Sequence, residues 1–194
     1  MPRPLRIQVA GGLYHVTAHC NTGRLLFCND SERDDFLSIA TDLIAGRAWS
    51  CRAYCLLTTH YHLLVETPEP DLAAGMRYLN GCYAQRINWR RGEKGHLFEG
   101  RYHAVMAEGD EHRTELQRYI AMNPVRASLV ARPEDWRWSS YRALLGLARA
   151  PALLDVEGAL LDFAGRDDEA RARLRSFVED ALLSSGEDEI GKAA

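Results

Sequence analysis

The order in which strand-like and helix-like segments follow one another constrains the fold of this chain more than any other feature of its sequence. Alternating, β-branched and aromatic residues predict strands at 11–20, 49–57, 60–68 and 96–109. Apolar residues spaced by three and four predict helices at 29–46, 71–92 and 110–123. The segments therefore follow the order β-α-β-β-α-β-α.

This order favours an α+β protein with a ferredoxin-like antiparallel sheet and helices on one face. After a loop at 133–141, further helices are expected near 140–148, 153–163 and 167–184. We therefore expect a first domain over residues 1–145 and a helical, acidic C-terminal tail over residues 146–194.

Local signals predict where two of the helices begin or end. Ser31 is the expected N-cap of the first helix and Gly46 its expected end. Pro124 is expected to stop the third helix directly after Asn123, because proline has no backbone N–H to donate.

The charge of the chain is unevenly distributed. The net charge is −3, but residues 151–194 contain 5 basic and 11 acidic residues, which leaves 19 basic and 16 acidic residues in 1–150. Residues 1–150 are therefore modestly basic. The negative net charge of the whole chain thus does not argue against a nucleic-acid partner, and the basic charge of 1–150 does not by itself indicate one.

The composition of the chain indicates the cellular compartment of the protein. No apolar run approaches 18 residues, and the first 12 residues lack the apolar region of a secretory signal. The five cysteines include no CxxC pair, and Cys51 and Cys55 lie in an apolar strand-like run, so buried reduced thiols are expected. These features predict a cytoplasmic protein.

His60 and His62 flank Tyr61 in a strand-like segment. Because side chains alternate along a strand, both imidazoles point to the same face, within reach of one ion. Neutral imidazole is a common ligand for catalytic divalent metals. The pair by itself also fits two ordinary strand histidines. The length of the chain argues against a (β/α)₈ barrel, which typically needs about 250 residues.

Tyr119 and Asn123 lie four residues apart on the third helix and so share one of its faces, roughly 6 Å apart. A phenol is a plausible covalent nucleophile, and an amide oxygen is an acceptable ligand for Mg²⁺ or Mn²⁺. The alternative is a core residue, because Tyr119 stands between the apolar Leu116 and Ile120.

Together these motifs resemble a known family. His60-Tyr61-His62 matches the histidine-hydrophobe-histidine motif of HUH nucleases, and the segment from Tyr119 to Ala127 is similar to the tyrosine helix of single-tyrosine transposases. The chain more narrowly resembles the REP-associated tyrosine transposases of the insertion-sequence 200-like family. The supporting segments are YHVTAHCNTGRLLF (14–27), GHLFEGRYHAV (95–105) and DWRWSSYRAL (135–144).

The resemblance implies a role for each matched residue. His60, His62 and Asn123 correspond to the metal ligands, with Mg²⁺ or Mn²⁺ as the cofactor. Tyr119 corresponds to the nucleophile that forms a 5′-phosphotyrosine and frees a 3′-hydroxyl. The chain is therefore expected to be an HUH endonuclease and transposase that nicks and rejoins single-stranded or hairpin DNA.

The chemistry of attack by tyrosine on a phosphodiester supports the expected role of a divalent metal ion. The pKa of free tyrosine is near 10, so a phenol attacking at neutral pH needs help from its surroundings. A divalent ion on a non-bridging phosphate oxygen acts as a Lewis acid and orients the phosphate. Two imidazoles and one amide leave positions open for that oxygen and for water.

DNA contacts are expected from basic residues interleaved with Trp89, Phe98 and Tyr102, since cations bind phosphates and aromatic rings stack on unpaired bases. The candidates are Arg86, Arg90, Arg91, Lys94 and Arg101, with His15 and His103 on neighbouring strands. A solvated helix end with core aromatics explains the same pattern equally well.

Two competing readings stay open at this point. One is a domesticated protein that binds hairpin DNA without cutting it; the other treats the histidines and Tyr119 as structural residues. Whether the active unit is a homodimer or a monomer also stays open.

Overall fold

The computed structural model describes residues 8–164 and 166–190, with side chains through Leu182. Its centre is a four-stranded antiparallel sheet in the order β2-β3-β1-β4. The strands are β1 (Gly12–His19), β2 (Ser50–Leu56), β3 (His60–Thr67) and β4 (His103–Met106). This order and the βαββαβ succession confirm the predicted ferredoxin-like α+β fold.

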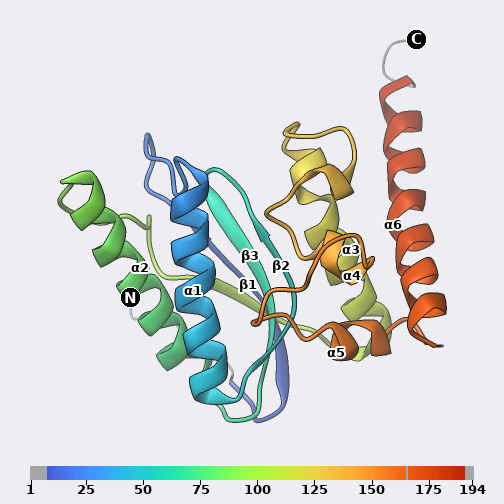
Figure 1. The fold of residues 1–194 in the computed structure, drawn as a ribbon, viewed down its shortest axis with the longest axis horizontal. Coiled ribbons are helices and arrows are strands. Elements are labelled where there is room, and N and C mark those ends of the chain that lie inside the picture. The colour runs from blue at the N-terminus through green and yellow to red at the C-terminus, as the bar shows by residue number, and fades with distance from the viewer. Residues whose placement is uncertain (1–7, 165, 191–194) are drawn as a thin grey trace, which may run out of the picture.

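Two long helices, α1 (Asp30–Arg47) and α2 (Leu72–Arg91), cover one face of the sheet (Figure 1). Beneath them the strands contribute one set of alternate residues, including Val16, Tyr61 and Leu63, to the main core. Aromatic rings fill the space between the layers: Phe36 of α1 lies 4.7 Å from Tyr61 and 5.2 Å from Tyr83, measured between ring centroids. This face is therefore closed to water.

Helix α3 (Gly109–Arg126) lies against the other face of the sheet, so the expectation of helices on one face holds only for α1 and α2 (Figure 1). Its Leu116 and Ile120 pack into a second apolar cluster with Cys55 and Leu64, among others. The physical reason is visible in β2 and β3, which are almost continuously buried, as expected for strands covered on both faces.

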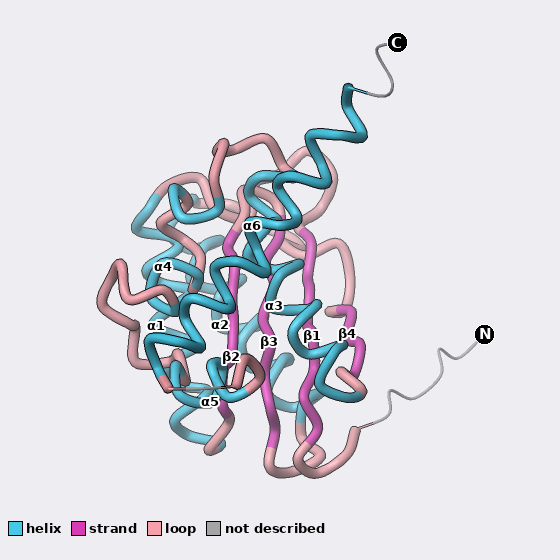
Figure 2. Tube along the Cα trace, turned by 90° about the vertical axis from the view of Figure 1, so that its right-hand side faces the viewer, coloured by secondary structure: helices cyan, strands magenta, loops and turns pink. Residues whose placement is uncertain are grey.

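The chain then adds a C-terminal layer of three short elements and one long helix. They are η1 (Pro133–Asp135), α4 (Tyr141–Leu144), α5 (Val156–Leu161) and α6 (Asp167–Ile190). Backbone bonds attach this layer to β2: the Leu56 N–H donates to the Trp138 carbonyl and the Asp155 N–H to the Cys51 carbonyl, both at 2.9 Å. Figure 2, in the view onto α3 and α6, shows the four strands behind these helices. The division of the chain at residue 145 stays a prediction.

Several expected boundaries were wrong. Asn29, and not Ser31, is the N-cap of α1, accepting a hydrogen bond from the Glu32 N–H at 3.1 Å. The helix passes Gly46 and ends with Ala48 in the left-handed conformation, at φ 51°. Pro124 lies inside α3, which continues to Arg126 because proline costs the last turn only one hydrogen bond.

Strand β4 is much shorter than the predicted strand at 96–109. Residues 96–101 form a loop that touches the sheet through one isolated bridge, between Cys20 and Phe98. All five cysteines are free thiols, and Cys51 and Cys55 are buried as predicted. Within the described part of the chain, no helix has the length and apolar character needed to span a membrane.

Candidate active site

The histidine pair lies on β3, on the face of the sheet that α3 covers. The register places His60 opposite His19 and His62 opposite Thr17, and antiparallel partners point to the same side. Three further histidines thereby join the pair. A hollow of about 370 Å³ is lined by His15, Thr17, His19, His60, His62, His103, Val105, Leu116 and Tyr119.

Tyr119 lines this hollow from α3. Its ring centroid lies 5.6 Å from that of His62 and 5.6 Å from that of His15, in edge-to-face geometry. The residue is 39% exposed, so it is not the core tyrosine that its apolar neighbours in the sequence allowed. The guanidinium carbon of Arg126, nearly two turns later on α3, lies 5.0 Å from the Tyr119 ring centroid. The structure thus brings the phenol and the histidine pair together.

The hydrogen bonds of the pair leave free ring nitrogens. His62 Nδ1 lies 2.9 Å from His15 Nε2, whereas His62 Nε2 is buried and has no hydrogen-bond partner among the described residues. His60 Nδ1 lies 3.1 Å from the Thr59 hydroxyl. A buried nitrogen without a partner is costly in a folded protein unless something binds it.

Electrostatics keeps these imidazoles neutral. Burial, followed by the neighbouring histidines, lowers the pKa of His62 to about 2. Burial likewise lowers the pKa of His15 and of His60 to about 4, with smaller contributions from nearby histidines. At neutral pH each ring therefore keeps a lone pair, which is the form that binds a metal ion.

Asn123 is placed differently from the other predicted ligands. It is 7% exposed, it does not line the hollow, and its Nδ2 donates to the Tyr119 carbonyl at 2.8 Å. Among the described side chains, which end at Leu182, no group of three or more His, Cys, Asp or Glu is arranged to hold a metal. A third protein ligand would therefore have to be of another type, such as this amide.

The three predicted DNA-binding arginines of α2 lie on the opposite side of the sheet from the pair. Arg86 and Arg90 approach the Asp35 carboxylate of α1 at 3.3 and 2.6 Å. Arg91 pairs with the buried Glu32 at 2.5 Å and also donates to the Leu25 carbonyl at 2.9 Å. These arginines link α1 to α2, and their contact with DNA stays a prediction.

The remaining basic candidates lie in or near the loop before β4. Lys94 and Arg101 are exposed, and Arg101 makes no hydrogen bond or ion pair within the described part of the chain. His103 is exposed at the start of β4 and lines the hollow. His15 and His103 therefore adjoin the histidine pair, and their contact with DNA stays a prediction.

Two residues of the site were not predicted. His19 stacks on His60 with ring centroids 4.4 Å apart, and Arg126 approaches Tyr119. Strand alternation is a signal that could have found His19, which follows His15 by four residues on the same face. Helical spacing could have found Arg126, seven residues after Tyr119.

A ferredoxin-like sheet that carries a His-x-His pair on a central strand, beneath a helix-borne tyrosine, has the arrangement expected for single-tyrosine transposases. Residues 8–123 match the family described as transposase IS200 like. This match covers more than half of the chain and includes His60, His62, Tyr119 and Asn123, and the chain belongs to this family.

Individual proteins are also similar to this chain. A protein of Haemophilus influenzae, named as a REP-associated tyrosine transposase, is 24% identical over 142 residues, covering 68% of this chain and 80% of the relative. The solved structure of a REP-associated tyrosine transposase bound to a REP hairpin has the same fold, with a TM-score of 0.65 and 19% identity, over 86% of this chain and 93% of that one. A Deinococcus radiodurans transposase matches more loosely, with a TM-score of 0.42 and 20% identity, over 62% of this chain and 94% of that one. The resemblance to REP-associated tyrosine transposases is confirmed.

Proposed function

We propose that this transposase is a metal-dependent endonuclease that nicks and rejoins single-stranded or hairpin DNA through a phosphotyrosine on Tyr119. One observation carries the proposal: the Tyr119 ring lies 5.6 Å from the His62 ring, over a hollow open to solvent. Family membership supports DNA as the substrate, and the hairpin bound by the solved relative supports its structural class.

The residues of the hollow suit Mg²⁺ or Mn²⁺. The buried and unpartnered Nε2 of His62 is a ready ligand when His62 Nδ1–H donates to His15 Nε2, because the lone pair then lies on Nε2. His60 would bind beside it, and Asn123 would become the third ligand after its amide leaves the Tyr119 carbonyl. When bound, the ion would polarise a non-bridging oxygen of the phosphodiester.

The chain's own groups perform the bond changes in this mechanism. The Tyr119 oxygen attacks the phosphorus, the bond to the 3′-oxygen breaks, and the phenolic proton is lost while the leaving oxygen gains one. The product is a 5′-phosphotyrosine and a free 3′-hydroxyl. The guanidinium carbon of Arg126, 5.0 Å from the ring centroid, places a positive charge beside the nucleophile. Rejoining reverses these steps, and the energy conserved in the covalent link makes ATP unnecessary.

The test is adduct formation on a denaturing gel with an end-labelled single strand taken from beside the gene, in Mn²⁺. We expect the wild-type protein to form the covalent adduct and Tyr119→Phe to form none while still binding DNA. Tyr78→Phe is the matched control, because Tyr78 is also exposed but lies on α2, on the other face of the sheet. An adduct formed by Tyr119→Phe would show that the nucleophile is another residue.

A second candidate function is hairpin binding without cleavage. The position of Asn123 favours it, because the amide is hydrogen-bonded to its own helix and the described side chains give the pair no third ligand in this arrangement. This candidate predicts DNA binding with no adduct in Mg²⁺, Mn²⁺ or chelator. An adduct in any of these conditions would eliminate it.

A further inference from the structure

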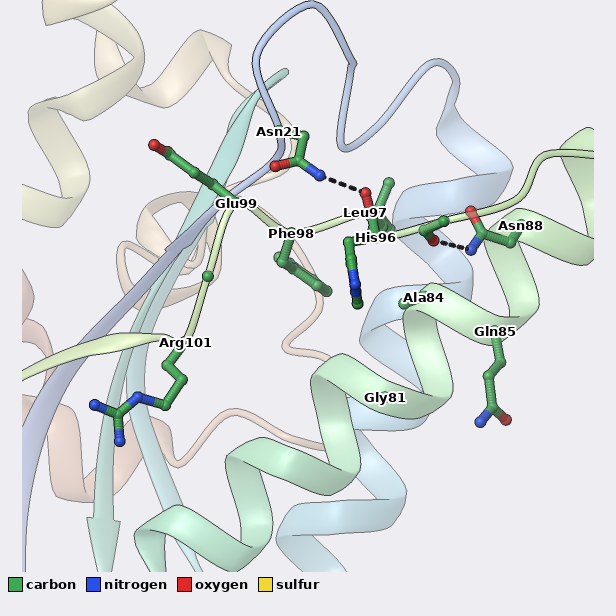
Figure 3. Close-up of a pocket in the computed structure, with 12 residues that line it drawn as sticks. Asn21, Gly81, Ala84, Gln85, Asn88, His96, Leu97, Phe98, Glu99 and Arg101 are labelled. Carbon is green, nitrogen blue, oxygen red and sulfur yellow. Dashed lines mark hydrogen bonds between the residues drawn. The ribbon is translucent and has the colours of Figure 1, made fainter. Parts of the chain in front are cut away.

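A groove of about 790 Å³ runs between α2 and the loop at residues 95–101 (Figure 3). Small residues make the space: Gly81 and Ala84 on α2, and Gly95 and Gly100 on the loop. A Cβ atom added at any of the three glycines would meet nothing within 4 Å. The groove is therefore wide enough for a planar group to enter.

Hydrogen bonds hold the loop wall of the groove in place. Asn21 Nδ2 donates to the His96 carbonyl at 2.6 Å, and Asn88 Nδ2 donates to the Gly95 carbonyl at 2.8 Å (Figure 3). Arg24 donates to the same His96 carbonyl at 2.8 Å. Because all three bonds lie within the chain itself, they give the loop wall a defined position, as in most binding sites.

Three polar side chains along the groove remain available. Gln85, Glu99 and Arg101 are exposed, and their side chains make no hydrogen bond or ion pair with the rest of the described chain. Figure 3 shows Gln85 extending from α2 and Arg101 from the loop. An arginine binds phosphate, whereas an amide and a carboxylate bind the edges of bases.

The groove adjoins the histidine hollow. His19 lines the hollow and Asn21, two residues later and about 7 Å along the extended chain, lines the groove. Arg101 and His103 repeat this relation on the neighbouring segment, and the Glu99 N–H donates to the His19 carbonyl at 3.0 Å. A strand lying in the groove can therefore continue into the hollow.

An aromatic surface extends the groove in the other direction. Trp89 is 85% exposed and follows Gln85 by one turn of α2, so the two share a face. Of the four arginines of α2, the last three are paired with Asp35 and Glu32 of α1. An exposed tryptophan ring is suited to stacking on an unpaired base.

We propose that this groove binds the unpaired nucleotides that flank the phosphodiester held over the histidine pair. Arg101 contacts a phosphate, Glu99 and Gln85 contact base edges within the groove, and Trp89 stacks on a base at its far end. Glu99 also favours bases with an exocyclic amino group, since a carboxylate can only accept hydrogen bonds. The inference rests on the proposed function for the identity of the strand.

The test measures the affinity of full-length variants for a fluorescent oligonucleotide with an unpaired extension, by anisotropy. Gly81→Glu fills the groove with a negative charge and is expected to weaken binding about tenfold, the loss of one stacked base. Gly46→Glu is the matched control, since this exposed helical glycine of α1 also has open space at its Cβ. Gly81→Ala, which leaves the groove open, is expected to bind as the wild type does.

Equal affinities for Gly81→Glu and Gly46→Glu, with thermal unfolding showing both folded, would overturn the proposal. So would an equal loss on a blunt duplex that has no unpaired nucleotides. Trp89 gives an independent readout, because Trp49 and Trp138 are buried and Trp136 is partly buried. We expect the unpaired strand to quench tryptophan fluorescence in the wild type and far less in Trp89→Phe; equal quenching in both would contradict the stacking.

The two proposals fail in different ways. If no condition gives a Tyr119 adduct but Gly81→Glu still weakens binding, the groove binds DNA and the proposed nuclease activity is wrong. If the adduct forms and Gly81→Glu binds normally, the nuclease activity is supported and the proposed role of the groove is wrong.

Discussion

The two faces of the central sheet differ, although the same strands build both. On the face beneath α1 and α2, Val16 and Tyr61 are buried in a continuous core. On the other face, one residue away along the chain, His15 and His62 line a hollow open to solvent. Because side chains alternate along a strand, the same strands contribute to the core on one face of the sheet and to the histidine hollow on the other.

Coverage explains the difference. Helices α1 and α2 together cover their whole face, whereas α3 contacts mainly β2 and β3, where Leu116 and Ile120 meet Leu64. Toward β1 and β4 the same face is polar and partly exposed. A sheet can keep such a half-covered face because its other face supplies most of the apolar burial.

The largest expected effect concerns the closed face. Phe36→Ala should lower the free energy of unfolding by about 3–5 kcal/mol, because the ring is fully buried among Phe27, Tyr61 and Tyr83. Tyr119→Ala on the open face should cost about 1 kcal/mol or less. Urea unfolding of both variants measures the contrast, and similar losses would show that the faces do not differ in packing.

The next effect belongs to the histidine pair. His62→Ala should weaken Mn²⁺ binding by more than about a hundredfold, beyond the loss typical of an outer-shell partner, and remove metal-dependent nicking. Isothermal titration with Mn²⁺ measures the first and a gel the second. His96→Ala is a suitable control, because His96 is exposed on the groove loop and outside the hollow. Unchanged Mn²⁺ affinity in His62→Ala would reject the ligand assignment.

His15 should have a smaller effect on the same measurement. Its Nε2 lies 2.9 Å from His62 Nδ1 and positions the ring, so His15→Ala should weaken Mn²⁺ binding about 10–100-fold. His15→Gln, which retains a polar group near that position, should recover part of the loss. His103→Ala is the comparison variant, because His103 also lines the hollow. If it weakens Mn²⁺ binding as much as His15→Ala does, His15 has no special positioning role.

The smallest expected effect concerns the ion pair between Glu32 of α1 and Arg91 of α2. Burial alone would raise the pKa of Glu32, but the hydrogen bonds from Arg91 and the Cys28 N–H outweigh it and lower that pKa. The pair should therefore contribute about 1–2 kcal/mol above the unfolded pKa of about 4.5, and this contribution should be lost as Glu32 is protonated below it.

Unfolding of wild type and Glu32→Gln between pH 7 and pH 3 checks the sign. The stability difference should be largest at neutral pH and shrink as the pH falls. A difference that grows toward acid pH would mean that the ion pair does not stabilise the folded state.

Much of the fold and site could be predicted because their signals are local. The two-residue and 3.6-residue periods predicted the ferredoxin-like order, and the spacings of His60/His62 and Tyr119/Asn123 placed each pair on one face. The contacts of the arginines on α2 could not be predicted, because they depend on distant partners. Arg86, Arg90 and Arg91 cluster with aromatic residues in the sequence, yet Asp35 and Glu32, more than 50 residues earlier, pair with them.

The sequence by itself determined the alternation of β3, the spacing on α3 and the family motifs, because these depend on backbone geometry that each segment has alone. Only the tertiary structure decided that α3 packs mainly over β2 and β3, that His19 and Arg126 reach the site, and that Asn123 turns to the Tyr119 carbonyl. Those outcomes depend on helix placement and side-chain rotamers, which packing between distant segments selects and no local pattern encodes.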